Sequence, residues 1–572
     1  MVRTVKKLYD ICIDVAVADC ITACQFCKKE FRYLPNNVLF DFYHKMFLEK
    51  RLCLLAVEFS DLDVFNRVLS VKHQRTKFLK CFQSLIEHGT HIPEEIIKSY
   101  LYYCKNADLL DVSVIETGLR IGGFFNEGGL YRCSIEILNI TEEICKTRIR
   151  DVTTLRMLLD CYHKRIYAES VYCEFDQAAE TFKSAQEVVR QLELFNYVPN
   201  LAGLYSNYSF LYFLRSEYDE AFTWSQRALK LLNEDLSPRI IIEVLRQASK
   251  SCVVKRKFNP AGLLIGQAVI LASNLFEIDN HPHFSDTLLD YGFYLLHYDS
   301  IQESVKMYER ALAIRKDMFQ KNNIHIALGH EDLAYALYVN EYSSGRFYKA
   351  KENAERSIRI MERILPKDHL LLASVKRVKA LILEEIALDE QNDVEIHNSY
   401  LQEAEQLHKA ALELSFKSFG EKNVQTAKHY GNLGRLYQSM KKYEEAERMH
   451  LRAIAIKEEL LGSDDYEVGL STGHLASLYN YHMKRHKDAE QLYLRSIKIN
   501  LKLFGDAYSG LEYDYRGLIN VYSKLMDAQM ALHYSYKMAE WKSLREKVKP
   551  ALHTNKLLPL GELVNEYFCL CE

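Results

Sequence analysis

The chain has few of the residues that interrupt helices or build sheets. Only 9 prolines and 22 glycines occur among its 572 residues, and alternating runs closed by Asn-Gly or Asp-Gly turns are nearly absent. Helices can therefore extend almost throughout, and a mainly β fold is excluded. A chain of this length is too long for one compact core, which indicates several domains or one long array.

Positive and negative charges nearly balance, and long apolar runs are also scarce. The formal net charge of −3 gives no sequence-wide attraction for nucleic acid or an anionic membrane. The longest apolar run, LLIGQAVILASNLF at 263–276, is shorter than the roughly 20 residues of a membrane span, so we expect no transmembrane segment. Aspartates interrupt the apolar N-terminal stretch, which we interpret as a helix rather than a signal peptide. The 14 scattered cysteines are typical of reduced thiols and predict a cytoplasmic location.

Small residues recur along the chain at a nearly constant spacing, mostly 42 or 43 residues. They are Ala185, Ala228, Ala268, Ala311, Ser357, Ala411, Ala453, Ser496 and Ala539. Small residues let neighbouring helices approach closely, and internal periodicity of this kind is typical of a solenoid. The spacing resembles the long form of the tetratricopeptide repeat found in kinesin light chains. Two wider steps indicate insertions at 341–347 and 389–400, and the second is polar enough to predict a loop.

We therefore expect an all-α fold, with a helical N-terminal box followed by an α-solenoid. Residues 1–50 form the box, and residues 51–150 form helical, degenerate repeats. Residues 151–548 form about nine tetratricopeptide-like repeats of the kinesin-light-chain type. Residues 549–572 form a tail that no pattern explains.

Polar side chains are predicted on the concave face of the array, where such repeats bind peptides. The expected groove residues are Asp286, Asp290, Glu331, Asp332, Lys376, Arg377, Lys428, Asn432, Arg435 and His474. Carboxylates occupy the middle repeats and complement an arginine, whereas the basic groups further on complement a carboxylate. For each single residue, the alternative that its charge only solvates an exposed helix face stays open.

Two apolar stripes with a spacing of four residues precede the array. The first consists of Leu8, Cys12 and Ala16, and the second of Leu34, Pro35, Val38 and Phe42. Proline suits the first turn of a helix, where its missing N–H costs nothing. Taken alone, the two stripes favour an ordinary helical pair that caps the solenoid.

The stripes also resemble two known motifs in their known order. Leu-x-x-x-Cys-x-x-x-small at residue 8 is similar to the elongin-binding box of ubiquitin-ligase receptors, although Lys7 stands where that pattern prefers a small residue or proline. Leu-Pro-x-x-aliphatic-x-x-x-aromatic at residue 34 is similar to the cullin-2 box. Longer stretches, among them DTLLDYGFYLL (286–296) and NVQTAKHYGNLGRLYQSM (423–440), resemble the amyloid protein-binding protein 2 family.

This resemblance implies a substrate receptor of a cullin-2 ubiquitin ligase. Elongins B and C would bind the first stripe, and cullin-2 with its RING subunit would bind the second. The groove would bind C-terminal peptides with arginine near a terminal glycine, which leads to ubiquitination and proteasomal degradation. The resemblance further implies binding to the amyloid precursor protein tail and to microtubules, with the nucleus, cytoskeleton and membranes as additional locations. The alternative is a cargo or microtubule adaptor in intracellular transport, which needs the groove but not the stripes.

No catalytic constellation is expected. CITACQFC at 20–27 has the cysteine spacing of a radical SAM loop, but that loop follows a strand of an α/β barrel, whereas this segment lies in a helical pattern. Free cysteines that act as small hydrophobes are the preferred interpretation. We therefore expect a binding protein that is not an enzyme, with no cofactor and no metal site.

Overall fold

The computed structural model describes residues 7–23, 30–107, 111–148, 151–276, 281–341, 345–390, 393–547 and 556–571. These residues form helices and the turns between them, and no strand occurs in any of these ranges. The prediction of an all-α solenoid is confirmed.

Eight α-helices and two short 3-10 helices make up the first part of the chain. They are α1 (Leu8–Ala23), η1 (Glu30–Tyr33), α2 (Asn36–Leu48), α3 (Leu52–Phe59), α4 (Leu62–Leu69), η2 (Lys72–Gln74), α5 (Arg75–Glu87), α6 (Ile92–Asn106), α7 (Ser113–Glu127) and α8 (Tyr131–Thr147). The core of this part is aromatic, because the rings of Phe65, Phe78, Phe82 and Phe124 lie with centroids 4.9 to 6.3 Å apart.

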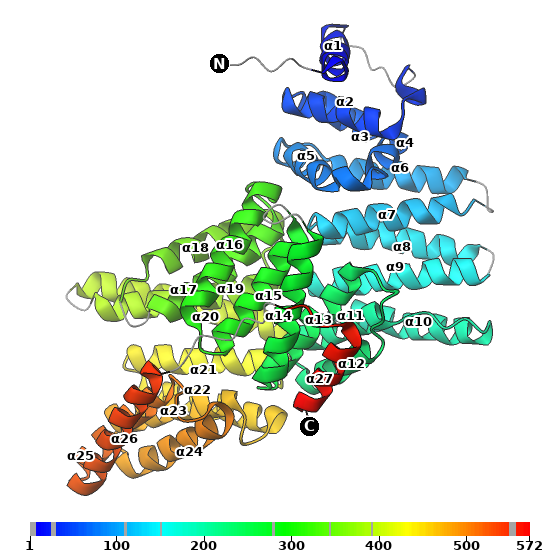
Figure 1. Cartoon of the computed structure of the whole chain (residues 1–572). Helices are drawn as coiled ribbons and strands as arrows, with labels where there is room; N and C mark the ends of the chain where they lie inside the picture. The colour runs from blue at the N-terminus through cyan, green and yellow to red at the C-terminus, as the bar shows by residue number, and fades with distance from the viewer. Residues whose placement is uncertain are drawn as a thin grey trace.

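Nine antiparallel helix pairs follow in the described residues. The first helices are α9 (Val152–Val171), α11 (Ala202–Leu214), α13 (Pro238–Val254), α15 (Pro282–His297), α17 (Ile324–Glu341), α19 (Leu371–Asp389), α21 (Val424–Ser439), α23 (Tyr466–Tyr481) and α25 (Leu511–Lys524). The second helices are α10 (Phe175–Leu194), α12 (Tyr218–Lys230), α14 (Phe258–Leu275), α16 (Ile301–Phe319), α18 (Tyr348–Ile364), α20 (Val394–Phe419), α22 (Tyr443–Leu461), α24 (His486–Phe504) and α26 (Ala528–Glu546). Figure 1 shows them stacked in chain order from the N-terminal helices to α26.

The recurrent small residues lie where helices cross, as their spacing predicts. From Ala185 to Ser496 each of them is at most 1% exposed. Ala539 differs and is exposed, because it lies on α26, against which no further repeat packs within the described part of the chain. The periodicity therefore reports helix-to-helix packing, and its last member marks the end of the array.

Among the described residues, the turn between the two helices of a repeat contains a left-handed residue in eight of the nine pairs. These residues are Cys173, Ser216, Arg256, Asp299, Gly345, Lys441, Lys484 and Met526, with φ between 56° and 69°. A left-handed residue just after a helix ends it and lets the chain reverse within a few residues. The short turns keep the two helices of each pair antiparallel and in contact along their length.

Successive turns of the superhelix touch each other. Asn323 donates through Nδ2 to the carbonyl oxygen of Gly128 at 2.8 Å. Asn423 donates to the carbonyl oxygen of Arg215 at 2.9 Å, and Ser509 donates to Asp299 at 2.8 Å. The last two pairs are 208 and 210 residues apart in sequence, or about five repeats of roughly 42 residues. The concave face is therefore shielded by the next turn and is not an open groove.

The predicted loop at 389–400 is wrong over most of its length, because only the residues between Asp389 and Val394 lie outside the helices. Helix α20 begins at Val394 and is 26 residues long. Asp393 caps it, because its Oδ1 accepts from the backbone N–H groups of Glu395 and Ile396 at 3.1 Å. The insertion therefore lengthens a surface helix, and its polar residues face solvent without breaking the helix. The first insertion, at 341–347, falls partly outside the described residues, which omit 342–344.

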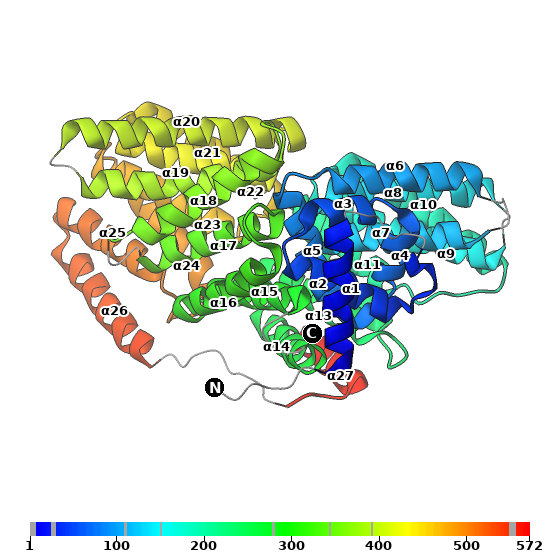
Figure 2. The same ribbon diagram turned by 90° about the horizontal axis from the view of Figure 1, so that it is seen from above.

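The apolar run at 263–276 lies almost entirely in α14. Among the described residues, only this helix is long and apolar enough to cross a membrane by length and composition. It instead packs in a hydrophobic cluster with α13, α15 and a final helix, α27 (Leu560–Cys571). The tail thus folds back onto the middle of the array, and Figures 1 and 2 both place α27 against α14.

We expect Asn323 to stabilise the contact between turns far more than the charges at its edge. Asn323 is 3% exposed, and Asn323→Ala removes the donor to the carbonyl oxygen of Gly128 and to the side-chain oxygen of Gln83. The expected loss of unfolding free energy is about 1–3 kcal/mol, measured by urea denaturation. The control is Lys80→Ala, which removes the exposed ion pair with Asp317 on the same interface and should cost less than about 1 kcal/mol. Equal effects of the two substitutions would contradict the assignment.

Candidate functional site

The first apolar stripe lies on the solvent side of α1. Leu8 is 76% exposed, and Ile11, Cys12 and Val15 are exposed beside it. The opposite side of the helix packs on α2 through Val17, which is fully buried, while Ala16 lies between the two sides and is half-buried. An ordinary capping helix would bury its apolar stripe, whereas α1 leaves one side uncovered.

Polar contacts fix the position of α1 and leave that side free. The Tyr9 hydroxyl donates to Asp41 Oδ2 at 2.7 Å, and Lys45 Nζ lies 2.7 Å from Asp14 Oδ1. Both partners belong to α2, so the two helices form a unit that presents the exposed stripe as a rigid surface.

The second stripe has both buried and accessible members. Pro35 is the N-cap residue of α2, one position before the first turn that the sequence predicts for it, and is exposed, while Leu34 and Val38 are half-buried. Phe42 is 3% exposed and its ring lies 4.5 Å from that of Phe31. Phe42 therefore belongs to the core, and Leu34, Pro35 and Val38 are the members that a partner could contact.

We call the space enclosed by the shielded concave face the channel. Two of the carboxylates predicted there are already paired with basic side chains. Arg246 and Lys250 lie 2.8 and 3.3 Å from Asp290. Arg315 donates to Asp286 Oδ1 at 2.7 Å. Arg246 and Asp290 stand at equivalent positions of consecutive repeats, so their pair links α13 to α15.

Two of the predicted cations are also paired. Arg435 donates to Glu385 Oε1 at 2.8 Å, and Lys428 lies 3.0 Å from Glu467 Oε1. Glu467 additionally binds Lys457 at 3.0 Å, and these two cations hold the pKa of its carboxyl well below the ordinary value although burial opposes this. These pairs stabilise the contacts between α19, α21, α22 and α23.

Four of the predicted acidic, lysine and arginine residues make no ion pair with any described residue. They are Glu331 and Asp332 on α17 and Lys376 and Arg377 on α19, all half-buried. The guanidinium of Arg377 lies 5.3 Å from the centroid of the Tyr335 ring. The acidic and basic residues thus stand on the first helices of adjacent repeats.

Burial raises the pKa of both unpaired carboxyls. For Glu331 the pKa rises to about 7, through desolvation and the neighbouring charge of Asp332. For Asp332 it rises to about 6, through desolvation and the charge of Asp290, although Arg315 and Lys250 oppose the rise. Burial disfavours the ionised form of these carboxyls, so a cationic group that binds beside them would stabilise that form.

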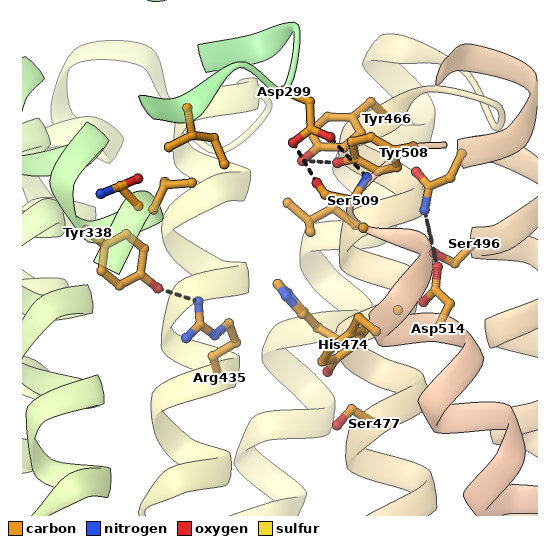
Figure 3. A pocket seen from close by; sticks show the side chains of 18 of the residues that line it. Asp299, Tyr338, Arg435, Tyr466, His474, Ser477, Ser496, Tyr508, Ser509 and Asp514 are labelled. Carbon is orange, nitrogen blue, oxygen red and sulfur yellow. Dashed lines mark hydrogen bonds between the residues drawn. The ribbon is translucent and has the colours of Figure 1, made fainter. Parts of the chain in front are cut away.

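A cavity of about 1000 Å³ opens further along the same channel. Figure 3 shows Arg435 directed toward Tyr338 on one wall, His474 between the walls, and Asp299 with Tyr466, Tyr508 and Ser509 at the rim. Its walls come mainly from α17, α19, α21, α23 and α25. The start of α16, Ser496 and Asn500 of α24, Arg545 of α26 and the turns before α16 and α25 complete the lining. Arg435 and His474 are the predicted groove residues that line this cavity.

Acidic groups predominate in the cavity wall. Glu384 and Glu385 face Arg435, and Asp299 pairs with Arg545. Asp514 is 2% exposed and accepts hydrogen bonds from Ser496 at 2.8 Å and Asn500 at 3.2 Å. Burial raises its pKa to about 7, so its proton can be lost near neutral pH.

Several of these residues were missed by the sequence interpretation. Glu384 and Glu385 lie two helical turns after the predicted Arg377 on α19, whereas Asp514 lies on α25, a first helix on which no groove residue was predicted. Asn432 is half-buried on α21, and burial together with Arg435 lowers the pKa of His474. Of the CITACQFC motif, Cys24, Cys27 and the side chain of Cys20 lie outside the described residues.

A family model and two curated relatives match this chain. The tetratricopeptide repeat family matches residues 393–459. Amyloid protein-binding protein 2 of Mus musculus is 46% identical over 546 residues, which cover 95% of this chain and 92% of that protein, and the Rattus norvegicus protein has the same identity and coverage. Among solved structures, the apo form of the quorum sensor NprR from B. thuringiensis aligns at 13% identity and a TM-score of 0.42, over 67% of this chain and 97% of that one.

Substitution by asparagine should raise the free energy of unfolding at Asp332 and lower it at Asp286. The folded-state pKa of Asp332 is above its ordinary value of 3.8, so the folded state loses stability as the pH rises from about 4 to about 6. Asp332→Asn removes this cost and should raise unfolding free energy by the order of 1–2 kcal/mol at pH 7.5, with a smaller gain at pH 5.

Asp286 is the matched control. Arg315 and Arg246 outweigh burial and hold its pKa well below the ordinary value, so its contribution to stability is lost only below about pH 4. Asp286→Asn leaves the buried Arg315 unpaired and should cost roughly 3–5 kcal/mol at both pH values. Urea midpoints at the two pH values measure all four differences, and destabilisation by Asp332→Asn at pH 7.5 would refute the assignment.

Proposed function

The chain belongs to the amyloid protein-binding protein 2 family and is a protein-binding tetratricopeptide-repeat protein, and we propose that it is the substrate-recognition subunit of a cullin-2 ubiquitin ligase. In this role α1 binds elongins B and C, and the region around Pro35 binds cullin-2. The channel binds C-terminal peptides of the proteins to be ubiquitinated. Ubiquitin transfer is carried out by the RING subunit and its partners, so this chain performs no chemistry itself. We propose the cytoplasm as its main location.

The exposed side of α1 is the observation that carries this proposal. Leu8, Ile11, Cys12 and Val15 form an uncovered apolar stripe on a helix that α2 holds in place. Apolar side chains gathered on one side of a helix are typical of a surface that docks on a partner. The motif resemblance supplies the partner, since the stripe coincides with the positions of an elongin-binding box.

The channel supports recognition of a peptide with charges of both signs. An arginine and a terminal carboxylate three residues later are separated by about 10 Å in an extended chain, and packed helices lie about 8–10 Å apart. Glu331 and Asp332 on α17 therefore suit the arginine, and Lys376 and Arg377 on α19 suit the carboxylate. Because Asp290, Lys428 and Arg435 are already paired, we assign them to the support of the channel, together with Asn432.

A cargo adaptor is the second candidate. The name of the curated relatives states that they bind an amyloid protein, which favours binding of the cytoplasmic tail of the amyloid precursor protein and a role in transport along microtubules. Both candidates use the channel. Only the ligase receptor needs the exposed stripe of α1, so variants of that stripe distinguish them.

We expect Leu8→Asp combined with Cys12→Asp to abolish binding of the elongin B and C complex. Both side chains are exposed, so the substitutions should leave the melting temperature unchanged while they place two charges in an apolar interface. Each buried apolar side chain contributes roughly 1–3 kcal/mol to such an interface. Calorimetric titration of purified elongins into the full-length chain measures the loss.

Asp10→Ala, an exposed change elsewhere on the same helix, is the control and should bind as the natural chain does. Pro35→Asp should lose cullin-2 and keep the elongins. If elongins bind the double variant with unchanged affinity, α1 is not the docking site and the adaptor candidate gains support.

For the channel, we expect Asp332→Asn and Arg377→Gln each to weaken binding of a peptide with arginine three residues before a free C-terminal glycine. Each substitution removes a charge-assisted hydrogen bond of about 1.5–3 kcal/mol, which corresponds to roughly tenfold or more in Kd. Affinity for the natural chain should rise between pH 6 and 8, because the raised pKa values of Glu331 and Asp332 leave fewer carboxylates ionised at the lower pH.

Fluorescence anisotropy with a labelled peptide measures these affinities. Glu352→Gln, an exposed change on α18, is the matched control and should bind normally. Amidation of the peptide terminus should weaken binding to the natural chain but have little further effect on Arg377→Gln. Equal binding of the amidated and free peptides by the natural chain would rule out the carboxylate contact.

A further inference from the structure

Helix α14 differs in composition from the other second helices of the array. Its sequence, FNPAGLLIGQAVILASNL, contains no charged residue, whereas every other second helix has charges on its outer side. A helix that is apolar on all sides has a partner on all sides. The repeats supply that partner on the inner side only, so the outer side of α14 requires another one.

Helix α27 covers the outer side of α14. Leu563 and Tyr567, four residues apart, are 1% and 0% exposed in a cluster with Ala261, Leu264 and Ile265. The Tyr567 hydroxyl reaches Cys252 Sγ of α13 at 3.6 Å. One side of an amphipathic helix thus lies across α13 and α14, while Asn565, Glu566 and Cys569 face solvent.

Polar side chains also bind the backbone of residues 556–571. Gln267 is fully buried in the middle of α14. Its Nε2 donates to the carbonyl oxygen of Lys556 at 2.9 Å, and its Oε1 accepts from the backbone N–H of Leu558 at 2.8 Å. At the other end, Lys257 Nζ donates to the carbonyl oxygen of Cys571 at 2.9 Å, where the C-terminus of a helix favours a cation.

These contacts have the properties of a complex between a protein and a peptide. A buried glutamine is costly unless both ends of its amide are satisfied, and here the tail satisfies both. Two side chains anchor α27 in the core, whereas each second helix from α10 to α24 buries at least four. The segment also reaches α14 from the far end of the array, since it follows α26 in the chain.

We propose that α13 and α14 form a second peptide-docking surface, on the outside of the array, and that residues 556–571 are its tethered and reversibly bound ligand. The surface takes an extended residue pair followed by an amphipathic helix with leucine and tyrosine four residues apart. Docking ties the last repeat to a repeat six positions earlier, beside the contact between Asp299 and Ser509.

The experiment uses the full-length chain with a released tail. In Leu563→Asp/Tyr567→Asp the two anchors carry charges, so the tail leaves the surface empty. A labelled synthetic peptide of residues 556–571 should then bind saturably in the micromolar range. It should bind the natural chain at least tenfold more weakly, because the tethered copy competes at high effective concentration. The control Asn565→Asp/Cys569→Asp adds two charges on the exposed side and should behave as the natural chain.

A peptide with the same two aspartates should not bind the released variant. If the released variant keeps its circular dichroism spectrum and melting temperature but fails to bind the natural peptide, the proposal is wrong. Hydrogen exchange on the natural chain gives an independent measurement. Amides of residues 560–571 should exchange at least tenfold faster than those of α13, whereas exchange of both at the same slow rate would show that α27 is a permanent part of the fold and would overturn the proposal.

Discussion

The contact between successive turns of the superhelix is the constraint on which the other features depend. Because Asn323, Asn423 and Ser509 each join segments about five repeats apart, the concave face is shielded from solvent. Charges on a shielded face are costly unless they are paired. Asp286, Asp290, Lys428 and Arg435 are paired across neighbouring repeats, and Glu331 and Asp332, which are not, have raised pKa values.

Features that recur every 42 residues or so could be predicted from the sequence. Contacts between residues of different superhelical turns could not. The positions of Ala185 to Ser496 predict the helix crossings because each depends only on neighbouring repeats. The pair of Arg246 and Asp290, 44 residues apart, could also have been predicted from their shared offset. The contact of Asp299 with Ser509 could not, because it depends on small crossing angles that add up over five repeats. An aspartate favours the N-cap of a helix, so Asp393 indicates the start of α20 within a segment whose polar composition alone predicts a loop.

The stripes before the array show a different limit. A spacing of four residues indicates an apolar side of a helix but not whether that side packs inside or faces a partner. Helix α1 has both kinds of side, with Val17 buried and Leu8 exposed. In α2 the spacing selected Phe42, which lies in the core, together with the accessible Pro35. Periodicity therefore finds candidate interfaces, and only the packing of the neighbouring helices separates them from core.

The touching turns also restrict the topology of any ligand in the channel. A segment in the middle of a folded protein continues in both directions and cannot be threaded between turns that are held together. A free chain end can pass through an opening and advance until its charges meet complementary groups. In the proposed function, the superhelix would act as a filter for termini before any side chain is recognised. Selectivity for chain ends would then follow from the curvature of the array and not only from the cations that would bind a terminal carboxylate.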